Sequence, residues 1–268
     1  MNNKSTYPNS VSSPILERFL QAVYQPYKWL IVIPLFGIFT IVFSFFSIIS
    51  SILISSKAGN FWAFLWGRIV CYIVPIRVFK KGTENIDKKK SYVIIANHQT
   101  AIDILMLSGF LGIDFRWIMK KELYKVPFLG FACKKAGYIF IDRKSAKASL
   151  ESLNEAKQKL VNGTSVMIFP EGTRSGKKEM LQFKRGAFKM AVDLELDILP
   201  VTVMNSYKIL RKGVINLMPG RAGFVIHSPL AIARYGNDME RLMKDARIIL
   251  ESGQETGIFR NSIKPKIN

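Results

Sequence analysis

The sequence predicts an α/β fold, with a mixed, largely parallel β-sheet flanked by helices and preceded by a pair of apolar membrane-attachment helices. A long uncharged segment near the N-terminus supports the helix pair. From about residue 77, short β-branched runs alternate with helical stretches, the pattern of an α/β domain. A chain of 268 residues has room for one sizeable domain and an attachment element. We therefore expect a membrane-attachment segment at 1–76 and a separate domain at 77–268.

Two apolar segments, at 29–56 and 61–76, define the N-terminal part. The first contains no charged residue, and it exceeds the roughly 20 residues that cross a bilayer core. It is also longer than the apolar region of a signal peptide, which spans about 7–15 residues. The second is interrupted only by Arg68 and contains Trp62 and Trp66, a residue type that prefers the membrane interface. Two arrangements fit: one span followed by an interfacial helix, or a hairpin that enters one leaflet and returns.

Beyond residue 77, the hydrophobic pattern predicts strands and helices in alternation. We expect strands at 77–80, 92–96, 116–119, 138–141, 165–169, 198–203, 214–218 and 222–227. We expect helices at 102–110, 128–135, 145–160, 186–194 and 238–251. The tail at 261–268 is expected to be frayed.

The charge balance indicates an anionic partner. The chain has 39 Lys and Arg against 19 Asp and Glu, a formal net charge of +20. Such a charge favours phosphorylated substrates, acidic carrier proteins, anionic membrane surfaces or nucleic acid. There is no recognisable nucleic-acid motif, and the uncharged segment favours lipid. Cys71 and Cys133 have neither metal-ligand nor disulfide spacing, so we expect two small buried thiols and no metal site.

The first candidate site follows the predicted strand at 92–96. His98, one of two histidines, and Asp103 precede the predicted helix. Residues five apart on one helix would point about 140° away from each other. The two side chains can therefore meet only if His98 lies in the loop and Asp103 on the first helical turn. The carboxylate could then bind one ring nitrogen and leave the other as a general base. The alternative is a loop histidine beside a helix-entry charge favoured by the helix dipole.

Charged residues also follow other predicted strands. The block after 165–169 combines a glycine that permits a tight turn with an arginine whose planar fork suits a phosphate. A basic pair opens the helix at 186–194, whose free N–H groups would add to an anion site. The alternatives are solvated lysines and arginines, and a Glu171 that merely pairs with Arg174. The candidate substrate-binding residues are Glu171, Gly172, Thr173, Arg174, Lys120, Lys121, Lys184 and Arg185.

Four blocks in order make the chain resemble the glycerolipid acyltransferases, most closely those that act on 1-acyl-sn-glycerol-3-phosphate. The family has an Asn-His-x-x-x-x-Asp block, a Gly-x-Ile-Phe-Ile-Asp-Arg block, a Phe-Pro-Glu-Gly-Thr-Arg-Ser block and a hydrophobic-Pro-Val block. Here these are Asn97, His98 and Asp103; residues 137–143; residues 169–175; and residues 199–201. Two departures are small, since Thr100 stands where serine is common and Leu199 where isoleucine or valine is usual. Neither removes a catalytic group.

The resemblance implies a glycerol-phosphate acyltransferase-like fold and a reaction. A fatty acyl group would pass from acyl-CoA or acyl carrier protein to the sn-2 hydroxyl of lysophosphatidic acid, giving phosphatidic acid without a cofactor. His98 would be the general base and Asp103 its orienting partner, and Arg174 would hold the acceptor's phosphate. Since no Gly-x-Ser-x-Gly elbow occurs and no cysteine adjoins His98, we expect direct transfer. The catalytic domain would lie at the cytoplasmic face of a membrane.

Two alternatives stay open from the sequence. The acceptor could instead be glycerol-3-phosphate, another lysophospholipid or a lyso-aminolipid. More remotely, the chain could be a non-catalytic basic membrane adaptor. His227 lies far from every block, and we expect it to be structural.

Overall fold

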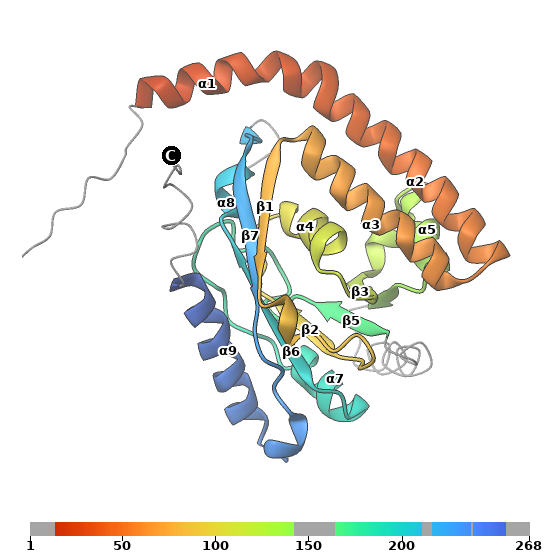
Figure 1. Cartoon of the computed structure of the whole chain (residues 1–268), viewed down its shortest axis with the longest axis vertical. Coiled ribbons are helices and arrows are strands. Elements are labelled where there is room, and N and C mark those ends of the chain that lie inside the picture. The colour runs from red at the N-terminus through yellow and green to blue at the C-terminus, as the bar shows by residue number, and fades with distance from the viewer. Residues whose placement is uncertain (1–13, 142–163, 211–215, 237, 256–268) are drawn as a thin grey trace, which may run out of the picture.

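The computed structural model describes residues 14–141, 164–210, 216–236 and 238–255. Within these ranges, seven strands form one sheet in the order β1-β7-β6-β2-β5-β3-β4 (Figure 1). Every neighbouring pair is parallel except β6–β7. The predicted mixed, largely parallel sheet is therefore confirmed. The strands are β1 Ile76–Lys81, β2 Val93–Ala96, β3 Phe115–Lys120, β4 Ile139–Ile141, β5 Ser165–Ile168, β6 Ile198–Met204 and β7 Gly220–Ile226.

Helices cover both faces of the sheet, which explains why its central strands are apolar on both sides. Val93, Ile94 and Ile95 of β2 are completely buried, and they divide between the two hydrophobic clusters. One cluster packs α3 Ser56–Ile73 and α4 Ile102–Phe110 against the sheet. The other packs α7 Gly186–Leu194 and α9 Met239–Glu255 against the opposite face (Figure 1).

Shorter elements complete the described chain. They are η2 Thr83–Asn85, η3 Lys121–Lys125, α5 Leu129–Lys135, α8 Ser206–Ile209 and η5 Ile232–Arg234. The α8 turn directly follows β6, and η3 directly follows β3. Both therefore lie at the carboxyl ends of their strands.

The apolar N-terminal segments form a helical hairpin. α1 Pro14–Tyr27 continues through η1 Lys28–Val32 into α2 Ile33–Leu53, and α3 returns alongside α2 (Figure 1). Among the described residues, one helix, Ala22–Leu53, is long and apolar enough to cross a membrane. The two apolar segments thus pack side by side as a pair of helices, and their arrangement in a membrane stays a prediction.

Polar groups and close packing fix the two helices of this hairpin. The indole N–H of Trp62 donates to Ser50 Oγ at 2.8 Å, and that of Trp66 donates to Thr40 Oγ1 at 3.1 Å. On its other side α3 approaches the α4 backbone so closely that a Cβ on Gly67 would lie 2.6 Å from the Leu105 carbonyl oxygen. The hairpin is thus packed onto the α/β domain by one face. Its other face leaves large apolar side chains exposed: Phe36, Ile38, Ile41, Val42, Phe45, Phe46, Ile49, Ile52 and Leu53.

Most predicted elements match the structure to within a few residues, and the helices predicted at 102–110 and 186–194 match end to end. The strand predicted at 214–218 lies partly outside the described residues, and of its described part only Leu217 forms an isolated bridge, to Leu210. The helix predicted at 145–160, the residues Asp142 and Arg143 and the tail at 261–268 all lie outside the described residues.

Candidate active site

The candidate site lies where β2 and β5, two parallel neighbours in the centre of the sheet, end side by side. The loop after β2 carries His98, and the loop after β5 carries residues 169–176. Two backbone hydrogen bonds join the loops: Ser175 N–H donates to the His98 carbonyl at 2.8 Å, and Gly176 N–H donates to that of Gln99 at 3.0 Å. Residues more than 70 positions apart in the chain thus form one wall.

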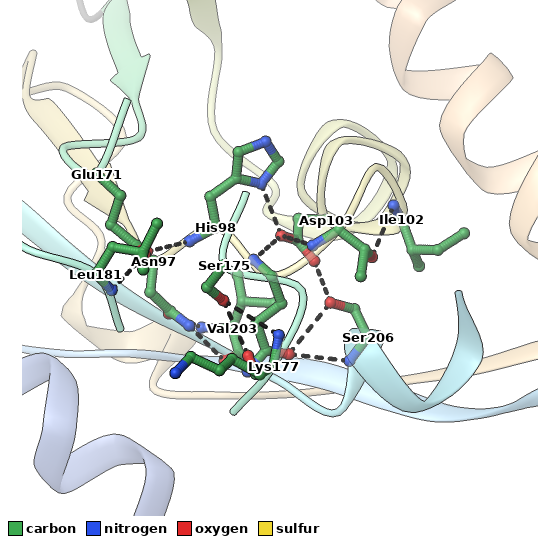
Figure 2. A network of polar contacts seen from close by, with 12 residues as sticks. Asn97, His98, Ile102, Asp103, Glu171, Ser175, Lys177, Leu181, Val203 and Ser206 are labelled. Carbon is green, nitrogen blue, oxygen red and sulfur yellow. Dashed lines mark hydrogen bonds and ion pairs between the residues drawn. The ribbon is translucent and has the colours of Figure 1, made fainter. Parts of the chain in front are cut away.

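His98 and Asp103 meet as their spacing predicts, with the histidine in the loop and the aspartate on the first turn of α4. His98 Nδ1 lies 2.8 Å from Asp103 Oδ2 (Figure 2). The same oxygen accepts the backbone N–H of Gln99 at 2.6 Å and that of Thr100 at 2.9 Å. These contacts fix a fully buried carboxylate in one orientation.

The second oxygen of Asp103 is held from a different part of the chain. The hydroxyl of Ser206, at the start of α8, donates to Asp103 Oδ1. Ser206 N–H also donates to Gln99 Oε1 at 3.1 Å, which ties the end of β6 to the His98 loop. Neither Ser206 nor Gln99 is predicted as a site residue from the sequence, and Ser206 belongs to none of the four blocks. No local pattern identifies a serine that acts 103 residues away.

Aromatic packing orients the His98 ring. It stacks on Phe169 with ring centroids 3.7 Å apart and planes 5° apart. The ring of Phe169 also packs against Trp117 of β3, with ring centroids 5.3 Å apart. No described residue binds the ring nitrogen remote from Asp103, and in Figure 2 it points away from the network. One ring nitrogen is therefore fixed and the other is left for a reacting group.

Asn97 of the first block has a structural contact on each side of its amide. Its Nδ2 donates to the Val203 carbonyl at 3.0 Å, and its Oδ1 accepts Val203 N–H at 2.7 Å. The side chain thus continues the pairing of β2 with β6 past the end of the strand. The amide holds the His98 loop at this place on the sheet.

Glu171 bridges backbone groups instead of pairing with Arg174. Its Oε1 accepts His98 N–H and its Oε2 accepts Leu181 N–H, both at 2.7 Å. Burial raises the pKa of this carboxyl, although the two backbone N–H bonds favour its charged form. Glu171 therefore fixes the 169–176 loop against the His98 loop.

Gly172 and Lys184 make a close contact beside Glu171. Gly172 has φ +72°, and a Cβ there would lie 3.2 Å from the end of the Lys184 side chain. Lys184 N–H also donates to the Pro170 carbonyl at 2.8 Å. The glycine thus permits both the turn and the approach of the cation.

The remaining predicted substrate-binding residues are exposed. Thr173 and Arg174 lie on the loop surface, and no described residue forms an ion pair with Arg174. Lys120 pairs with Glu122 at 3.0 Å and Arg185 pairs with Glu240 of α9 at 2.9 Å. Lys121 opens η3 after β3. The structure thus gathers Glu171, Gly172 and Lys184 around the His98 loop, and it directs Arg185 toward α9.

Cys133 does not belong to the polar network. Burial raises the pKa of its thiol to about 12, so it is protonated at neutral pH. Within the described ranges, no group of three His, Cys, Asp or Glu side chains could hold a metal ion.

An apolar pocket lies on the α2–α3 side of Trp117, the residue that supports Phe169. Thr40, Phe43, Ser44 and Ser47 of α2, Trp62, Ala63 and Trp66 of α3, and residues of β3 and α5 line it. Its remaining lining residues include Ile104, Met119, Leu123, Leu129, Ala132 and Cys133. Together, fold and site define an α/β protein that can take a proton from a bound group beside cationic and apolar surfaces.

Comparison with known proteins shows that this chain is similar to acyltransferases. A family model described as "Acyltransferase" matches residues 77–204. The structure is similar to that of the 1-acyl-sn-glycerophosphate (LPA) acyltransferase PlsC from Thermotoga maritima, with a TM-score of 0.73 and 26% sequence identity. That similarity covers 88% of this chain and 95% of the other. The α/β fold expected from the sequence is thus the fold of a known acyltransferase.

Curated relatives are named 1-acyl-sn-glycerol-3-phosphate acyltransferases. One from Mus musculus, the alpha form, is 39% identical over 138 residues, which are 51% of this chain and 48% of the relative. One from Helicobacter pylori is 36% identical over 148 residues, 53% of this chain and 62% of the relative. The chain thus spans about half to three fifths of their length. The chain is thus similar to acyltransferases over residues 77–204, which make up just under half of its length.

Proposed function

We propose that this protein transfers a fatty acyl group from an acyl thioester to the sn-2 hydroxyl of 1-acyl-glycerol-3-phosphate, giving phosphatidic acid. The observation that carries the proposal is the His98–Asp103 pair, with Nδ1 fixed at 2.8 Å and the other ring nitrogen unoccupied by any described residue. The names of its relatives supply the substrate class.

His98 acts as the general base. With Nδ1–H donated to Asp103, the lone pair of Nε2 takes the proton of the acceptor hydroxyl as its oxygen attacks the thioester carbonyl. The new C–O bond forms, the C–S bond breaks, and the imidazolium returns its proton to the leaving thiolate. Asp103 stabilises the imidazolium while its four hydrogen bonds keep it in place. No acyl-enzyme is needed, since no nucleophilic thiol or hydroxyl adjoins Nε2 among the described residues.

Arg174 and Lys184 hold the acceptor's phosphate. Both lie on or against the loop after β5, whose backbone is joined to the His98 loop. A guanidinium without an ion-pair partner among the described residues is free to make two parallel bonds to phosphate oxygens. Thr173 adds a hydroxyl on the same loop, and Lys120 and Lys121 add positive field from the end of β3.

The apolar pocket accommodates an acyl chain. It begins at Trp117, behind the aromatic ring on which His98 stacks, and continues between α2, α3 and α5. Apolar side chains line such a pocket because a fatty chain gains about 0.8 kcal/mol per buried methylene. The donor is acyl-CoA or acyl carrier protein, whose negative charge matches the basic surface.

The α2–α3 hairpin attaches the protein to the membrane. Because the α/β domain packs along one face of the hairpin, the exposed apolar face of α2 can enter one leaflet while the site stays at the surface. A lysolipid can then present its hydroxyl without leaving the bilayer. The catalytic domain, 77–268, lies on the cytoplasmic face in this proposal, and the positive charge of the chain supports contact with anionic lipid there.

A panel of acceptors and donors tests the activity on the purified full chain in lipid nanodiscs. Labelled acyl-CoA and acyl carrier protein are each offered with lysophosphatidic acid, glycerol-3-phosphate, other lysophospholipids and a lyso-aminolipid. Preferential formation of phosphatidic acid supports the proposal. Turnover with a different acceptor reassigns the substrate, and no turnover with any pair points to a non-catalytic membrane adaptor.

A further inference from the structure

A second exposed apolar surface lies at η3 and the start of α5, apart from the outer face of α2. Residues 121–128 are all exposed. Five large side chains within nine residues are between 39% and 57% exposed: Leu123, Tyr124, Val126, Phe128 and Phe131. A contiguous group of this kind on a folded domain marks an interaction site. With Lys125, Lys134 and Lys135, we call it the η3–α5 surface.

The backbone holds these side chains outward in a fixed turn. Phe128 has φ +61°, a conformation that a residue with a bulky side chain adopts only when its surroundings impose it. Gly130 N–H donates to the Val126 carbonyl at 2.9 Å, and a Cβ on Gly130 would lie 2.1 Å from the Tyr124 carbonyl oxygen. The turn is therefore closed tightly beneath an exposed aromatic ring.

Cations surround the apolar side chains. Lys134 Nζ lies 5.3 Å from the ring centre of Tyr124, and Lys135 Nζ lies 5.4 Å from that of Phe131. Lys125 ends η3. Apolar and aromatic groups beside lysines on flexible stems match a membrane surface, where rings enter the interface and ammonium groups meet lipid phosphates.

This surface adjoins the packed side of the hairpin. α5 packs against α2. Leu123, which is exposed, also lines the apolar pocket together with Leu129 and with Phe43 of α2. The pocket therefore reaches the surface beside the η3–α5 turn. An acidic protein partner would be attracted by the lysines, but it would leave unexplained why the apolar group adjoins both the hairpin and the pocket.

We propose that the η3–α5 surface contacts an anionic lipid bilayer directly and holds the mouth of the apolar pocket at the membrane interface. The proposal rests on the membrane attachment in the proposed function and adds a second contact to the hairpin. It does not depend on which acceptor is acylated.

Depth-dependent quenching tests this contact in the full chain. An environment-sensitive fluorophore is attached at Phe128→Cys and its quenching by spin-labelled lipids is measured in phosphatidylcholine nanodiscs with and without phosphatidylglycerol. Phe45→Cys, on the exposed face of α2, reports the hairpin. Ile248→Cys is the matched control, since Ile248 is 53% exposed on α9, across the sheet. Cys71 and Cys133 are buried, and the labelled unmodified chain gives the background.

We expect the label at 128 to be quenched about as strongly as the label at 45, more so with phosphatidylglycerol, and the label at 248 to stay at background. Quenching at 45 but not at 128 overturns the proposal and leaves the hairpin attachment intact. Quenching at neither position overturns both. If acyl carrier protein in solution shields position 128 while lipids do not quench it, the surface binds protein.

A paired activity measurement links the surface to catalysis. Phe128→Asp with Phe131→Asp should raise the KM for lysolipid in anionic nanodiscs at least fivefold and leave turnover of detergent-dispersed lysolipid unchanged. An equal loss in both settings contradicts a membrane role for the surface. An unmodified chain inactive in both settings contradicts the proposed function, while the quenching result still decides the contact.

Discussion

The two histidines of the chain each follow a strand, yet their surroundings differ. His98 Nδ1 meets the carboxylate of Asp103, and its other nitrogen is unoccupied by described residues. His227 Nε2 meets the hydroxyl of Thr202 at 2.8 Å. Because that hydroxyl donates to the Leu250 carbonyl, it accepts the ring N–H of His227. α9 closes over this nitrogen, since a Cβ on Gly253 would lie 2.7 Å from it.

Burial and hydrogen bonding alone do not equip a histidine to accept a proton. Burial lowers the pKa of His227, so the neutral ring is favoured, and no carboxylate of the described residues pairs with it to stabilise an imidazolium. Asp103 supplies that stabilisation to His98 from a carboxylate with four hydrogen bonds. Of the two histidines, only His98 has a ring nitrogen held by a carboxylate.

Removing the charge of Asp103, which distinguishes His98 from His227, should have the largest effect on turnover. We expect Asp103→Asn to lower kcat by roughly 10³–10⁴-fold, because the amide no longer selects the tautomer or stabilises the imidazolium. Steady-state kinetics on lysophosphatidic acid measures it. Asp114→Asn is the control, since Asp114 pairs with Arg116 and precedes β3 at the other end of the strand. A variant that keeps most of its kcat contradicts the role of Asp103.

Removing the Arg174 guanidinium should have the next largest effect. We expect Arg174→Ala to raise the KM for the acceptor by about 10–100-fold with little change in kcat, because a charge-assisted hydrogen bond to the phosphate is lost. Arg234→Ala, which changes another exposed arginine, in η5, is the control and should leave KM unchanged. If Arg174→Ala changes only the KM for the thioester, the phosphate site lies elsewhere.

Ser206 should affect kcat through its hydrogen bond to Asp103. We expect Ser206→Ala to lower kcat by about tenfold with KM unchanged, since one hydrogen bond to the carboxylate is lost. Ser206→Thr should restore most of the rate because it keeps the hydroxyl. Ser165→Ala removes the hydroxyl of another buried serine, which accepts the Tyr92 N–H at the start of β5, and should spare kcat. If Ser206→Ala and Ser165→Ala lose kcat equally, Ser206 contributes only to the stability of the fold.

His227 should affect stability and not turnover, and the effect should be the smallest. Because its pKa is lower in the folded chain, the unfolded chain binds the proton more readily. Its stability contribution is therefore full above about pH 6.5 and is lost as the pH falls toward its folded-state pKa. His227→Gln should show a smaller fall in Tm than the unmodified chain between about pH 7 and pH 5. If Tm falls equally with pH in the unmodified chain and in His227→Gln, the predicted direction of the His227 effect is wrong.

Sequence patterns predicted the sheet and the His98–Asp103 contact because both depend on local order. A five-residue spacing across a strand-to-helix junction leaves one way for the side chains to meet, and β-branched runs mark the central strands. The family resemblance predicted Glu171 as a site residue, but it did not predict that the carboxylate accepts the backbone N–H groups of His98 and Leu181. The spacing of side chains along the sequence cannot reveal a hydrogen bond to a backbone N–H group.

Contacts between distant segments escaped prediction. Ser206 reaches Asp103 only because β6 lies beside β2 in the sheet, and a strand order is not written in any single segment. Arg185 looked equivalent to Lys184, yet the first turns toward Glu240 of α9 and the second lies over Gly172. Adjacent residues at a helix start point in different directions, so charge alone could not separate them.

The most direct test compares His98→Ala with His227→Ala in one assay. Transfer of a labelled acyl group from thioester to lysophosphatidic acid is measured for both full-length variants in the same nanodiscs. We expect His98→Ala to lose about 10²–10⁴-fold in rate, the contribution of a general base, and His227→Ala to keep the unmodified rate wherever it is folded. A His98→Ala protein that transfers the acyl group at the unmodified rate contradicts the account.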